Sequence, residues 1–195
     1  MCSFDGKLYL FGGFQPKQNP SPASLSPETL PVVMEEGEDE WEDEPEEDDV
    51  TNTQVAMEFE WSSELFEFDG KTWKLLKSGG ITPRAAHSMA ATKSSEGKVS
   101  LYVFGGRGEK ERQNDIWRFE NGEWAQLKTK GCAPDPCSYS QLVCVGEDRL
   151  VAFGGLNQDN KHSDHLHVLD LSTNAWLLPE VCFNNFVVKV KMFLL

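Results

Sequence analysis

The sequence predicts an all-β fold, an incomplete β-propeller of about three four-stranded blades. One module occurs three times: a hydrophobic strand that ends in Gly-Gly, a short strand that ends near an acidic residue, and then a Trp. The three Trp residues, Trp73, Trp124 and Trp176, are 51 and 52 residues apart. A repeat near fifty residues with four short strands is typical of a propeller blade. Because one such unit cannot bury both of its faces, we expect neighbouring blades to stack.

The second copy, "LYVFGGRGEKERQNDIWRFENGEW", shows the elements of the module in order. Residues 101–104 predict a strand buried on both faces, and Gly105-Gly106 lets the backbone leave it where a side chain would clash with the next blade. Residues 115–120 alternate as the next strand, a turn follows at 121–123, and Trp124 opens the outer strand. The other copies, "LYLFGGF…ELFEFDGKTW" and "LVAFGGL…HLHVLDLSTNAW", predict the same order of strands.

One spacing between Gly-Gly pairs is irregular. Gly12 and Gly105 are 93 residues apart, whereas Gly105 and Gly154 are 49 apart. The difference predicts an insertion at 15–58, between the second and third strands of the first blade. Its Pro- and Ser-rich start and the run at 35–49, with 12 acidic and no basic residues, predict disorder. The net charge of −14 is therefore local, because the rest of the chain has 20 acidic and 18 basic residues.

The predicted organisation is three blades at 1–14 and 59–178, the insertion at 15–58, and a divergent tail at 179–195. The sequence has no run of the ~20 apolar residues that a spanning helix needs and no signal-peptide core, so we expect no membrane partner. Its five cysteines form an odd set without a CxxC pair, which favours free thiols in the cytoplasm or nucleus. The many acidic residues and the lack of a basic stripe argue against nucleic acid.

Five residues are candidates for a binding site on one rim of the blades. Loops between second and third strands emerge on the same face as the links between blades, and insertions on one face of a repeat array often mark its binding face. Arg107 and Arg112 lie in such a loop, Ser138 and Tyr139 begin the third blade, and Trp61 enters the first blade from the same rim. Two guanidinium groups, a hydroxyl and two aromatic rings predict a site that holds a carboxylate.

The repeats resemble the kelch-repeat β-propeller family. The stretches "TPRAAHS", "FGGRGEKERQNDIW" and "KGCAPDPCSYS" resemble most closely the kelch-domain substrate receptors of cullin-2 ubiquitin ligases, of the kelch domain-containing protein 2 type. That resemblance implies recognition of protein C-terminal peptides, typically ending in Gly-Gly, by Arg107, Arg112 and Ser138, with Trp61 lining the pocket. Tyr139 stands where those receptors have a Trp.

The sequence also departs from those receptors in two places. The acidic insertion replaces an insertion that carries Tyr contacts to the pocket, and the tail replaces the segment expected to bind elongin and cullin-2. Because the insertion starts at the same rim, its carboxylates could compete for Arg107 and Arg112. Contacts with ligase subunits are accordingly expected only of a form that has such a segment.

Two alternatives to a C-terminal degron receptor remain open. The first is a kelch protein-interaction scaffold without carboxylate recognition, and the second is a metal-dependent kelch enzyme. The enzyme would need clustered metal ligands, but His162, His165 and His167 belong to an ordinary repeat strand and its entry, so we interpret them as structural. We also expect His87 to be a core or rim residue with satisfied hydrogen bonds. The sequence favours a non-catalytic protein with no cofactor and no metal.

Overall fold

The computed structural model describes residues 1–16, 59–179, 182–183 and 186–187. The chain divides into two units, one formed by Met1–Gln15 with Trp61–Leu195 and the other by Pro16–Glu60. The acidic run at 35–49, predicted to be disordered, lies outside the described residues, as does most of the predicted tail.

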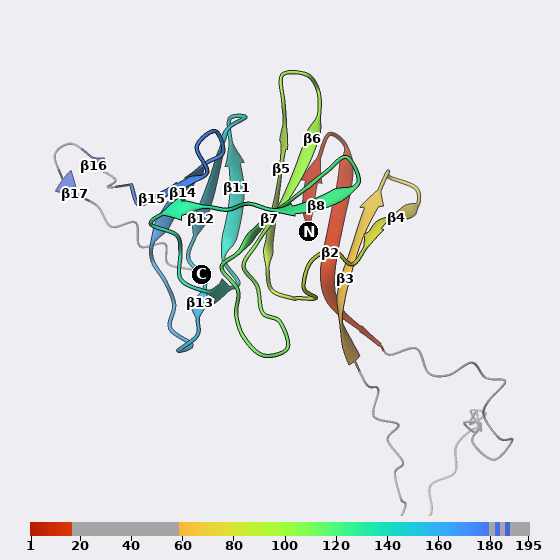
Figure 1. Cartoon of the computed structure of the whole chain (residues 1–195), viewed down its shortest axis with the longest axis horizontal. Helices are drawn as coiled ribbons and strands as arrows, with labels where there is room; N and C mark the ends of the chain where they lie inside the picture. The colour runs from red at the N-terminus through yellow and green to blue at the C-terminus, as the bar shows by residue number, and fades with distance from the viewer. Residues whose placement is uncertain (17–58, 180–181, 184–185, 188–195) are drawn as a thin grey trace, which may run out of the picture. The chain divides into compact units, whose positions relative to one another are not determined.

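The first unit contains three sheets in which four antiparallel strands follow one another in chain order, and a fifth strand joins the third of these sheets (Figure 1). We call them blades 1, 2 and 3. The strands of blade 1 are β1 (Cys2–Phe4), β2 (Lys7–Pro16), β3 (Phe59–Phe68) and β4 (Trp73–Ser78). Those of blade 2 are β5 (Ser88–Lys93), β6 (Val99–Phe104), β7 (Ile116–Glu120) and β8 (Glu123–Gln126). Those of blade 3 are β11 (Gln141–Val145), β12 (Arg149–Phe153), β14 (Leu166–Asp170) and β15 (Ala175–Leu177). The predicted all-β fold of about three four-stranded blades is confirmed.

Five shorter strands complete the described structure. Strand β9 (Lys130–Gly131) adds to the outer edge of blade 3 by parallel pairing with β15. Strand β10 (Cys137–Ser138) pairs with β13 (Leu156–Asn157), and β16 (Cys182–Phe183) pairs with β17 (Phe186–Val187). Within the described residues, no helix is long and apolar enough to cross a membrane.

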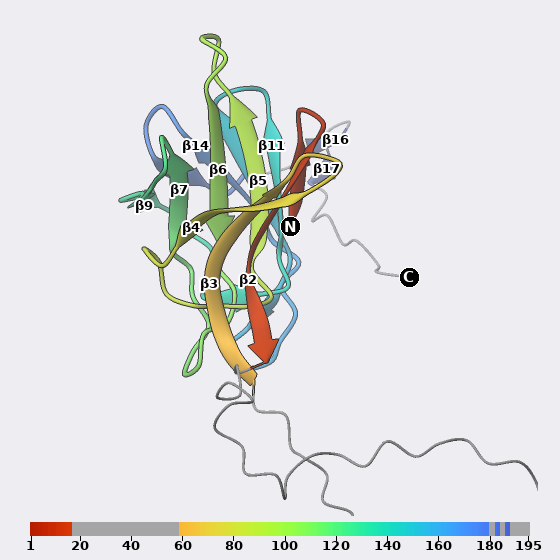
Figure 2. The same ribbon diagram turned by 90° about the vertical axis from the view of Figure 1, so that its right-hand side faces the viewer.

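Strands β2 and β3 are neighbours in blade 1 and run side by side in both ribbon views (Figures 1 and 2). Strand β2 ends at Pro16 and β3 begins at Phe59, and the predicted insertion between them lies almost entirely outside the described residues. The loops that follow β6 and β12 occupy the corresponding position in blades 2 and 3. The described loops of blades 2 and 3 therefore leave their blades at the same end of the second strand.

Two hydrophobic clusters lie between the blades. The cluster between blades 1 and 2 contains Tyr9, Phe11, Leu65, Met89, Ala91, Leu101, Val103 and Phe119 among its buried residues. The cluster between blades 2 and 3 contains Ala90, Tyr102, Phe104, Ile116, Leu142, Leu150, Ala152, Leu169 and Trp176. Strand β6 contributes alternate residues to the two clusters and is buried on both faces, as predicted. Each cluster combines residues of two sheets, so these blades stabilise one another.

The Gly-Gly pairs let neighbouring blades approach closely. A Cβ atom at Gly105 would lie 2.7 Å from the carbonyl oxygen of Cys137, and Gly105 has φ +63°. The next amide, that of Gly106, donates a 2.8 Å hydrogen bond to the same oxygen. A side chain at Gly105 would therefore meet the backbone of β10, which leads into blade 3, and this is the kind of clash that the sequence predicted.

An ion pair between a buried Arg and a half-buried Asp, which the sequence analysis did not predict, also connects the blades. Arg84 precedes β5 and has no solvent exposure. Its Nη1 and Nη2 atoms contact the two carboxylate oxygens of Asp115 at 2.5 and 3.0 Å, and Nη1 also donates to the carbonyl of Gly105 at 3.0 Å. The backbone carbonyl of Arg84 accepts a 2.8 Å hydrogen bond from the amide of Gly13 in blade 1. This residue therefore holds the ends of two Gly-Gly strands in place.

Candidate functional site

The linker between blades 1 and 2 brings three of the predicted site segments together through backbone hydrogen bonds. Linker residue 84 donates its amide to the carbonyl of Ser62, next to Trp61, at 3.2 Å. Residue 85 exchanges two hydrogen bonds with Arg107, at 2.9 and 2.8 Å, and the carbonyl of residue 86 accepts a 2.7 Å hydrogen bond from the amide of Tyr139. Segments far apart in the sequence thus meet at this linker.

Arg107 and Arg112 face one another across the loop between β6 and β7. They form an antiparallel bridge, and residues directly opposite in such a bridge have Cα atoms ~4.5–5.5 Å apart with side chains on the same side. The Arg107 side chain is exposed, whereas Arg112 is only 8% exposed. The loop therefore presents one guanidinium to solvent and holds the other behind it.

The guanidinium of Arg112 is held by a residue of β10 and by a residue of the loop that follows β13. Its Nε donates to Ser138 Oγ at 2.9 Å, and its Nη2 donates to Asn160 Oδ1 at 2.8 Å. Ser138 is fully buried. Because its hydroxyl accepts from Arg112, the hydroxyl hydrogen is still free to donate to another acceptor. The described residues provide no acceptor for Nη1 of Arg112.

Neither guanidinium has a carboxylate partner within the part of the chain that the structure describes. Arg84 is a useful contrast, since this buried guanidinium is neutralised by both oxygens of Asp115. A buried positive charge without a counter-ion is costly. Arg112 is therefore a buried guanidinium whose charge no described carboxylate neutralises.

The two aromatic candidates, Tyr139 and Trp61, differ in exposure and in their neighbours. Tyr139 follows Ser138 directly, is 72% exposed and has φ +59°. Trp61 is half-buried and packs against Phe14, with ring centroids 4.3 Å apart at an interplanar angle of 47°. The structure thus joins Arg112 to Ser138 directly and places Arg107 and Tyr139 beside them. Among the hydrogen bonds described above, the segment of Trp61 is joined to that of the arginines only through the linker at residues 84–85.

Sequence reasoning missed two loop residues that contact Arg112. Asn160 accepts from its Nη2 and has φ +58°. Gln158 makes two longer contacts with the backbone of Arg112, both at 3.4 Å. Both residues belong to the loop after β12, which corresponds to the loop of the arginines one blade earlier. A search of equivalent loops for amide side chains could have found them.

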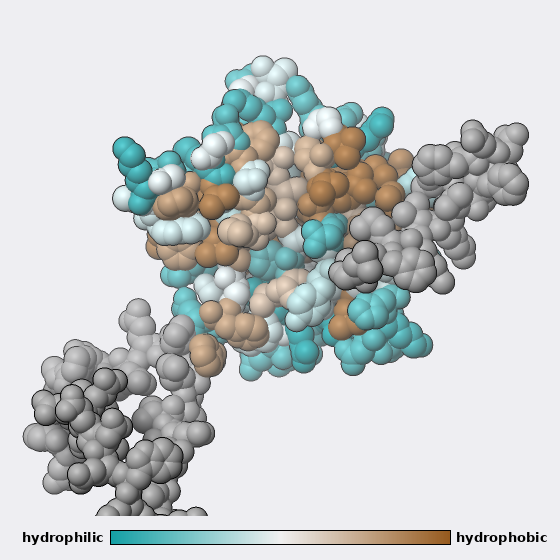
Figure 3. All heavy atoms as spheres, turned by 180° about the vertical axis from the view of Figure 1, so that it is seen from behind, coloured by the Kyte–Doolittle hydropathy of each residue, from teal (hydrophilic) through white to brown (hydrophobic). Residues whose placement is uncertain are grey.

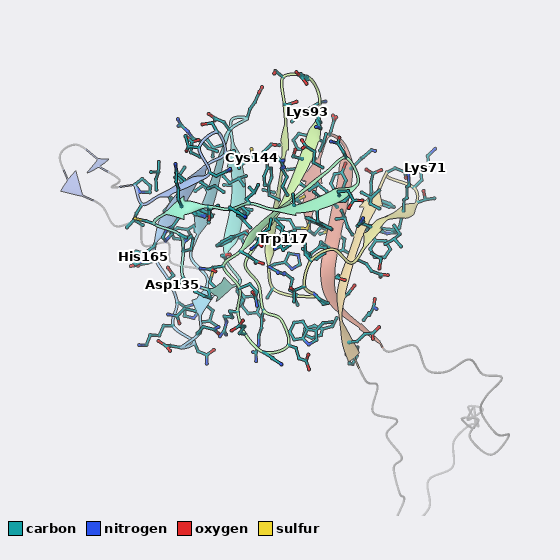
Figure 4. All side chains as sticks on the ribbon, in the orientation of Figure 1. Lys71, Lys93, Trp117, Asp135, Cys144 and His165 are labelled. Carbon is teal, nitrogen blue, oxygen red and sulfur yellow. The ribbon has the colours of Figure 1, made fainter. Side chains whose placement is uncertain are left out.

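A cavity of about 270 Å³ opens on blade 3 near its junction with blade 2. Its lining includes Asp135, His162, His165 and His167, and Figure 4 labels Asp135 and His165 at this end of the blade. The ring Nδ1 of His167 lies 2.9 Å from the carbonyl oxygen of Cys132. Among the described residues, no three His, Cys, Asp or Glu side chains are placed to hold a metal ion.

His87 differs from the prediction that its hydrogen bonds would be satisfied. Both of its ring nitrogens are buried, and neither has a hydrogen-bond partner among the described residues. Its ring packs against Phe11, with centroids 5.1 Å apart. Burial lowers the pKa of His87 from 6.5 to about 3, and the positive charges of the N-terminus and Arg84 act in the same direction. His87 is therefore a neutral core residue at physiological pH.

Comparison with known proteins gives one family match and several partial relatives. The KLHDC2/KLHL20/DRC7 Kelch-repeats domain matches residues 55–184. Kelch domain-containing protein 1 of Mus musculus is 34% identical over 124 residues, which cover 60% of this chain and 29% of that protein. Kelch domain-containing protein 2 of Bos taurus is 34% identical over 98 residues, which cover 49% of this chain and 23% of that protein. The chain thus spans less than a third of the length of these relatives.

A solved structure, that of YjhT, has a similar fold. It superposes with a TM-score of 0.50 at 18% sequence identity, and the match covers 59% of this chain and 44% of that chain. At this identity the similarity concerns the fold alone.

Proposed function

Because this chain belongs to the KLHDC2/KLHL20/DRC7 Kelch-repeats domain family, we propose that it is a non-catalytic recognition module that binds the C-terminal carboxylate of other proteins. Members of a family of kelch-repeat interaction domains recognise proteins through surface loops carried on a rigid scaffold. The proposed ligand is a chain that ends in Gly-Gly, bound at the rim formed by Arg107, Arg112, Ser138, Tyr139 and Trp61. Recruitment of elongin and cullin-2 subunits belongs to the same proposal only for a longer form that has the corresponding segment, and no described residue is assigned to it.

The observation that carries the proposal is the pair of guanidinium groups without carboxylate partners. Arg112 is 8% exposed and is oriented by Ser138 and Asn160, so little conformational freedom is left to lose when a ligand binds. Arg107, its cross-strand neighbour, is exposed and can close over an anion from the solvent side. Capture of a C-terminal carboxylate is a known mode of peptide recognition.

The hydrogen bonds already present restrict how a carboxylate would bind. Nε and Nη2 of Arg112 are used by Ser138 and Asn160. A carboxylate would therefore meet the Nη1 end of this guanidinium, with Arg107 supplying the second cation. In this arrangement Ser138 positions Arg112 from behind, since it is fully buried. The exposed ring of Tyr139 would pack against the last residues of the ligand.

Binding of peptides that end in Gly-Gly tests the proposal. Fluorescence polarisation should detect binding of a labelled peptide with a free terminal carboxylate and little binding of the same peptide amidated at its end. Each charge-assisted hydrogen bond contributes ~1.5–3 kcal/mol, so Arg112→Met and Arg107→Met should each weaken binding roughly 10- to 150-fold.

Arg118→Met is the matched control, because Arg118 lies on β7 and pairs with Glu120 at 3.6 Å. It should leave the affinity unchanged. Equal binding of the free and amidated peptides would exclude carboxylate recognition and favour a scaffold that binds proteins in another way.

A further inference from the structure

Blade 2 contains a binding site for a guanidinium group, and the chain's own Arg84 fills it. The Arg84 side chain donates to the carbonyl oxygen of Gly105, just after β6, and to the carboxylate of Asp115, just before β7. The indole nitrogen of Trp117 donates to the same carboxylate at 2.6 Å. Arg84 has no solvent exposure, so this site is fully occupied by a residue of the blade itself.

Blade 3 repeats the backbone of this site, with Cys137 in the place of Arg84. The carbonyl of Arg84 accepts a 2.8 Å hydrogen bond from the amide of Gly13, and the carbonyl of Cys137 accepts one of the same length from Gly106. Gly13 and Gly106 are each the second residue of the Gly-Gly pair in the preceding blade. The amides of Arg84 and Cys137 both donate to a carbonyl of the preceding blade, at 3.2 and 3.0 Å. The two residues therefore occupy equivalent positions in the repeat.

The wall opposite this position is repeated as well. The amide of Gly105 donates to the carbonyl of Asp115 at 3.1 Å, and the amide of Gly154 donates to the carbonyl of His165 at 3.2 Å. Asp115 directly precedes β7, as His165 directly precedes β14. Blade 3 thus keeps the backbone of the guanidinium site, but it has a Cys in place of the Arg and a His in place of the Asp.

The cavity of about 270 Å³ described above lies at this position of blade 3. Its lining includes Cys137, Gly154 and His165, which are the counterparts of the three residues that form the ion pair and its backbone contact in blade 2. Because a Cys side chain is much shorter than that of Arg, the space that the guanidinium fills in blade 2 remains a cavity in blade 3. Sites for drug-sized ligands measure ~300–1,000 Å³, so this smaller cavity suits a single side chain or a small ion.

The charges around the cavity favour a cation. Asp135 and Asp164 line it together with Lys161, so two carboxylates and one ammonium group give the lining a net charge of −1 when its imidazoles are neutral. No Lys or Arg of the described residues forms an ion pair with either carboxylate, and Asp164 has only a 3.8 Å contact with His165. Seen from behind, the loop end of blade 3 is mostly hydrophilic (Figure 3). Solvent-exposed polar residues therefore border the cavity.

We propose that this cavity binds a guanidinium group supplied by a ligand, as blade 2 binds that of Arg84. The carbonyl of Gly154 is the acceptor that corresponds to Gly105, and Asp135 and Asp164 are the counter-ions. A guanidinium has five N–H donors in a planar fork and is more weakly hydrated than an ammonium group. Acceptors on several sides of a small cavity therefore favour a guanidinium over an ammonium ion.

This site is separate from the proposed carboxylate site, and it attracts a group of the opposite charge. Both sites use the loop after β13: Asn160 binds Arg112, whereas residues 161–164 line the cavity. The guanidinium could belong to an Arg side chain of a bound protein or to a free small molecule such as arginine. Neither source requires the carboxylate site to function.

Titration of the full chain with arginine derivatives, followed in ¹H–¹⁵N NMR spectra, tests this proposal. Arginine blocked at both ends by acetyl and amide groups should shift the amide signals of Gly154 and His165 and saturate at millimolar concentrations. The blocked citrulline, which has the same shape without the charge, should shift neither signal, and the blocked lysine should bind more weakly. Comparison with free arginine identifies the source, since equal affinities assign the site to protein side chains and tighter binding of free arginine assigns it to a small molecule. Equal binding of the citrulline or lysine derivative would overturn the proposal.

His165→Asp gives the cavity the carboxylate that Asp115 supplies in blade 2. It should tighten binding of the blocked arginine about tenfold, the low end for a charge-assisted hydrogen bond, because His165 is partly exposed. Asp164→Asn should weaken binding roughly 2- to 5-fold, as expected for a partly exposed ion pair. Gln141→Glu is the matched control: it also adds a carboxylate to blade 3, but next to the buried Leu142 and hence on the opposite face of the sheet, and it should leave the affinity unchanged.

The double variant Cys137→Arg/His165→Asp rebuilds the ion pair of blade 2 inside blade 3. Its own guanidinium should fill the cavity, so the blocked arginine should no longer shift the signal of Gly154. Urea denaturation checks that this variant is folded, and if it is not, the opposite effects expected of His165→Asp and Asp164→Asn decide. Absence of binding to the wild type, an affinity that His165→Asp leaves unchanged, or binding that survives in the folded double variant would each overturn the proposal.

Discussion

Replacement of His87 should make the protein less sensitive to acid. The ring nitrogens of His87 are buried without a partner among the described residues, and burial holds its pKa at about 3. In the unfolded chain the pKa of a His is about 6.5. Below that pH the unfolded chain binds one proton more than the folded protein, so the free energy of unfolding falls as the pH falls.

The magnitude follows from this linkage. At pH 5 the unfolded His is protonated and the folded one is neutral, which costs about 1.36 kcal/mol for each pH unit below 6.5, or about 2 kcal/mol. This figure holds for any folded-state pKa well below 5. It is a large part of the ~5–15 kcal/mol by which domains are stable, and it corresponds to a fall of roughly 4–8 °C in Tm for a chain of this size.

Urea denaturation followed by Trp fluorescence, at pH 7 and pH 5, measures this effect. His87→Phe retains a ring against Phe11 and removes the titrating group. Between pH 7 and pH 5 its free energy of unfolding should therefore fall by about 2 kcal/mol less than that of the wild type. His165→Asn, at an exposed site, leaves His87 in place and should therefore keep the wild-type difference. An equal loss of stability in His87→Phe and the wild type would refute the assignment of a neutral, buried His87.

Two further predictions concern the contacts between blades. Gly105→Ala and Gly122→Ala both place Ala at a positive φ. The new Cβ atom at position 105 would lie 2.7 Å from the carbonyl oxygen of Cys137, whereas the new Cβ atom at position 122 would lie in open space. Gly122→Ala should lower the free energy of unfolding by about 1 kcal/mol, and Gly105→Ala should lower it by roughly 2 kcal/mol more, as measured by thermal unfolding. Equal losses in the two variants would contradict the close approach of the backbone at Gly105. Arg84→Met leaves the half-buried Asp115 with Trp117 Nε1 as its remaining hydrogen-bond partner and should cost about 3 kcal/mol, the lower end of the cost of breaking a buried ion pair. The double variant Arg84→Met/Asp115→Leu should recover part of this loss, and additive losses in a double-mutant cycle would rule out a coupled pair.

The repeat made the fold predictable. The Trp spacing and the Gly-Gly pairs predicted four-stranded blades, and they also predicted the close approach at Gly105, because a residue without Cβ after a buried strand has a local steric meaning. The loop that carries Arg107 and Arg112 was predictable for the same reason. Its place between the second and third strands depends only on counting within one repeat.

Other features were not predictable, because they depend on which side chains meet across blades. Arg84 and Asp115 are 31 residues apart and pair only when the linker packs on β7. The sequence pattern predicted that the hydrogen bonds of His87 would be satisfied, because no local signal shows that its ring nitrogens face apolar neighbours. For the candidate site, the sequence supplied the arginines but not Asn160, whose contact with Arg112 spans 48 residues.

By itself the sequence determined the blade repeat, its strands and the rim on which the arginines lie, because these follow from local periodicity and from residues without side chains. Only the tertiary structure decided that Arg112 is buried without a carboxylate partner among the described residues and that Ser138 holds it from behind. The physical reason is that burial and pairing arise between sheets, where the neighbours of a side chain come from distant parts of the chain.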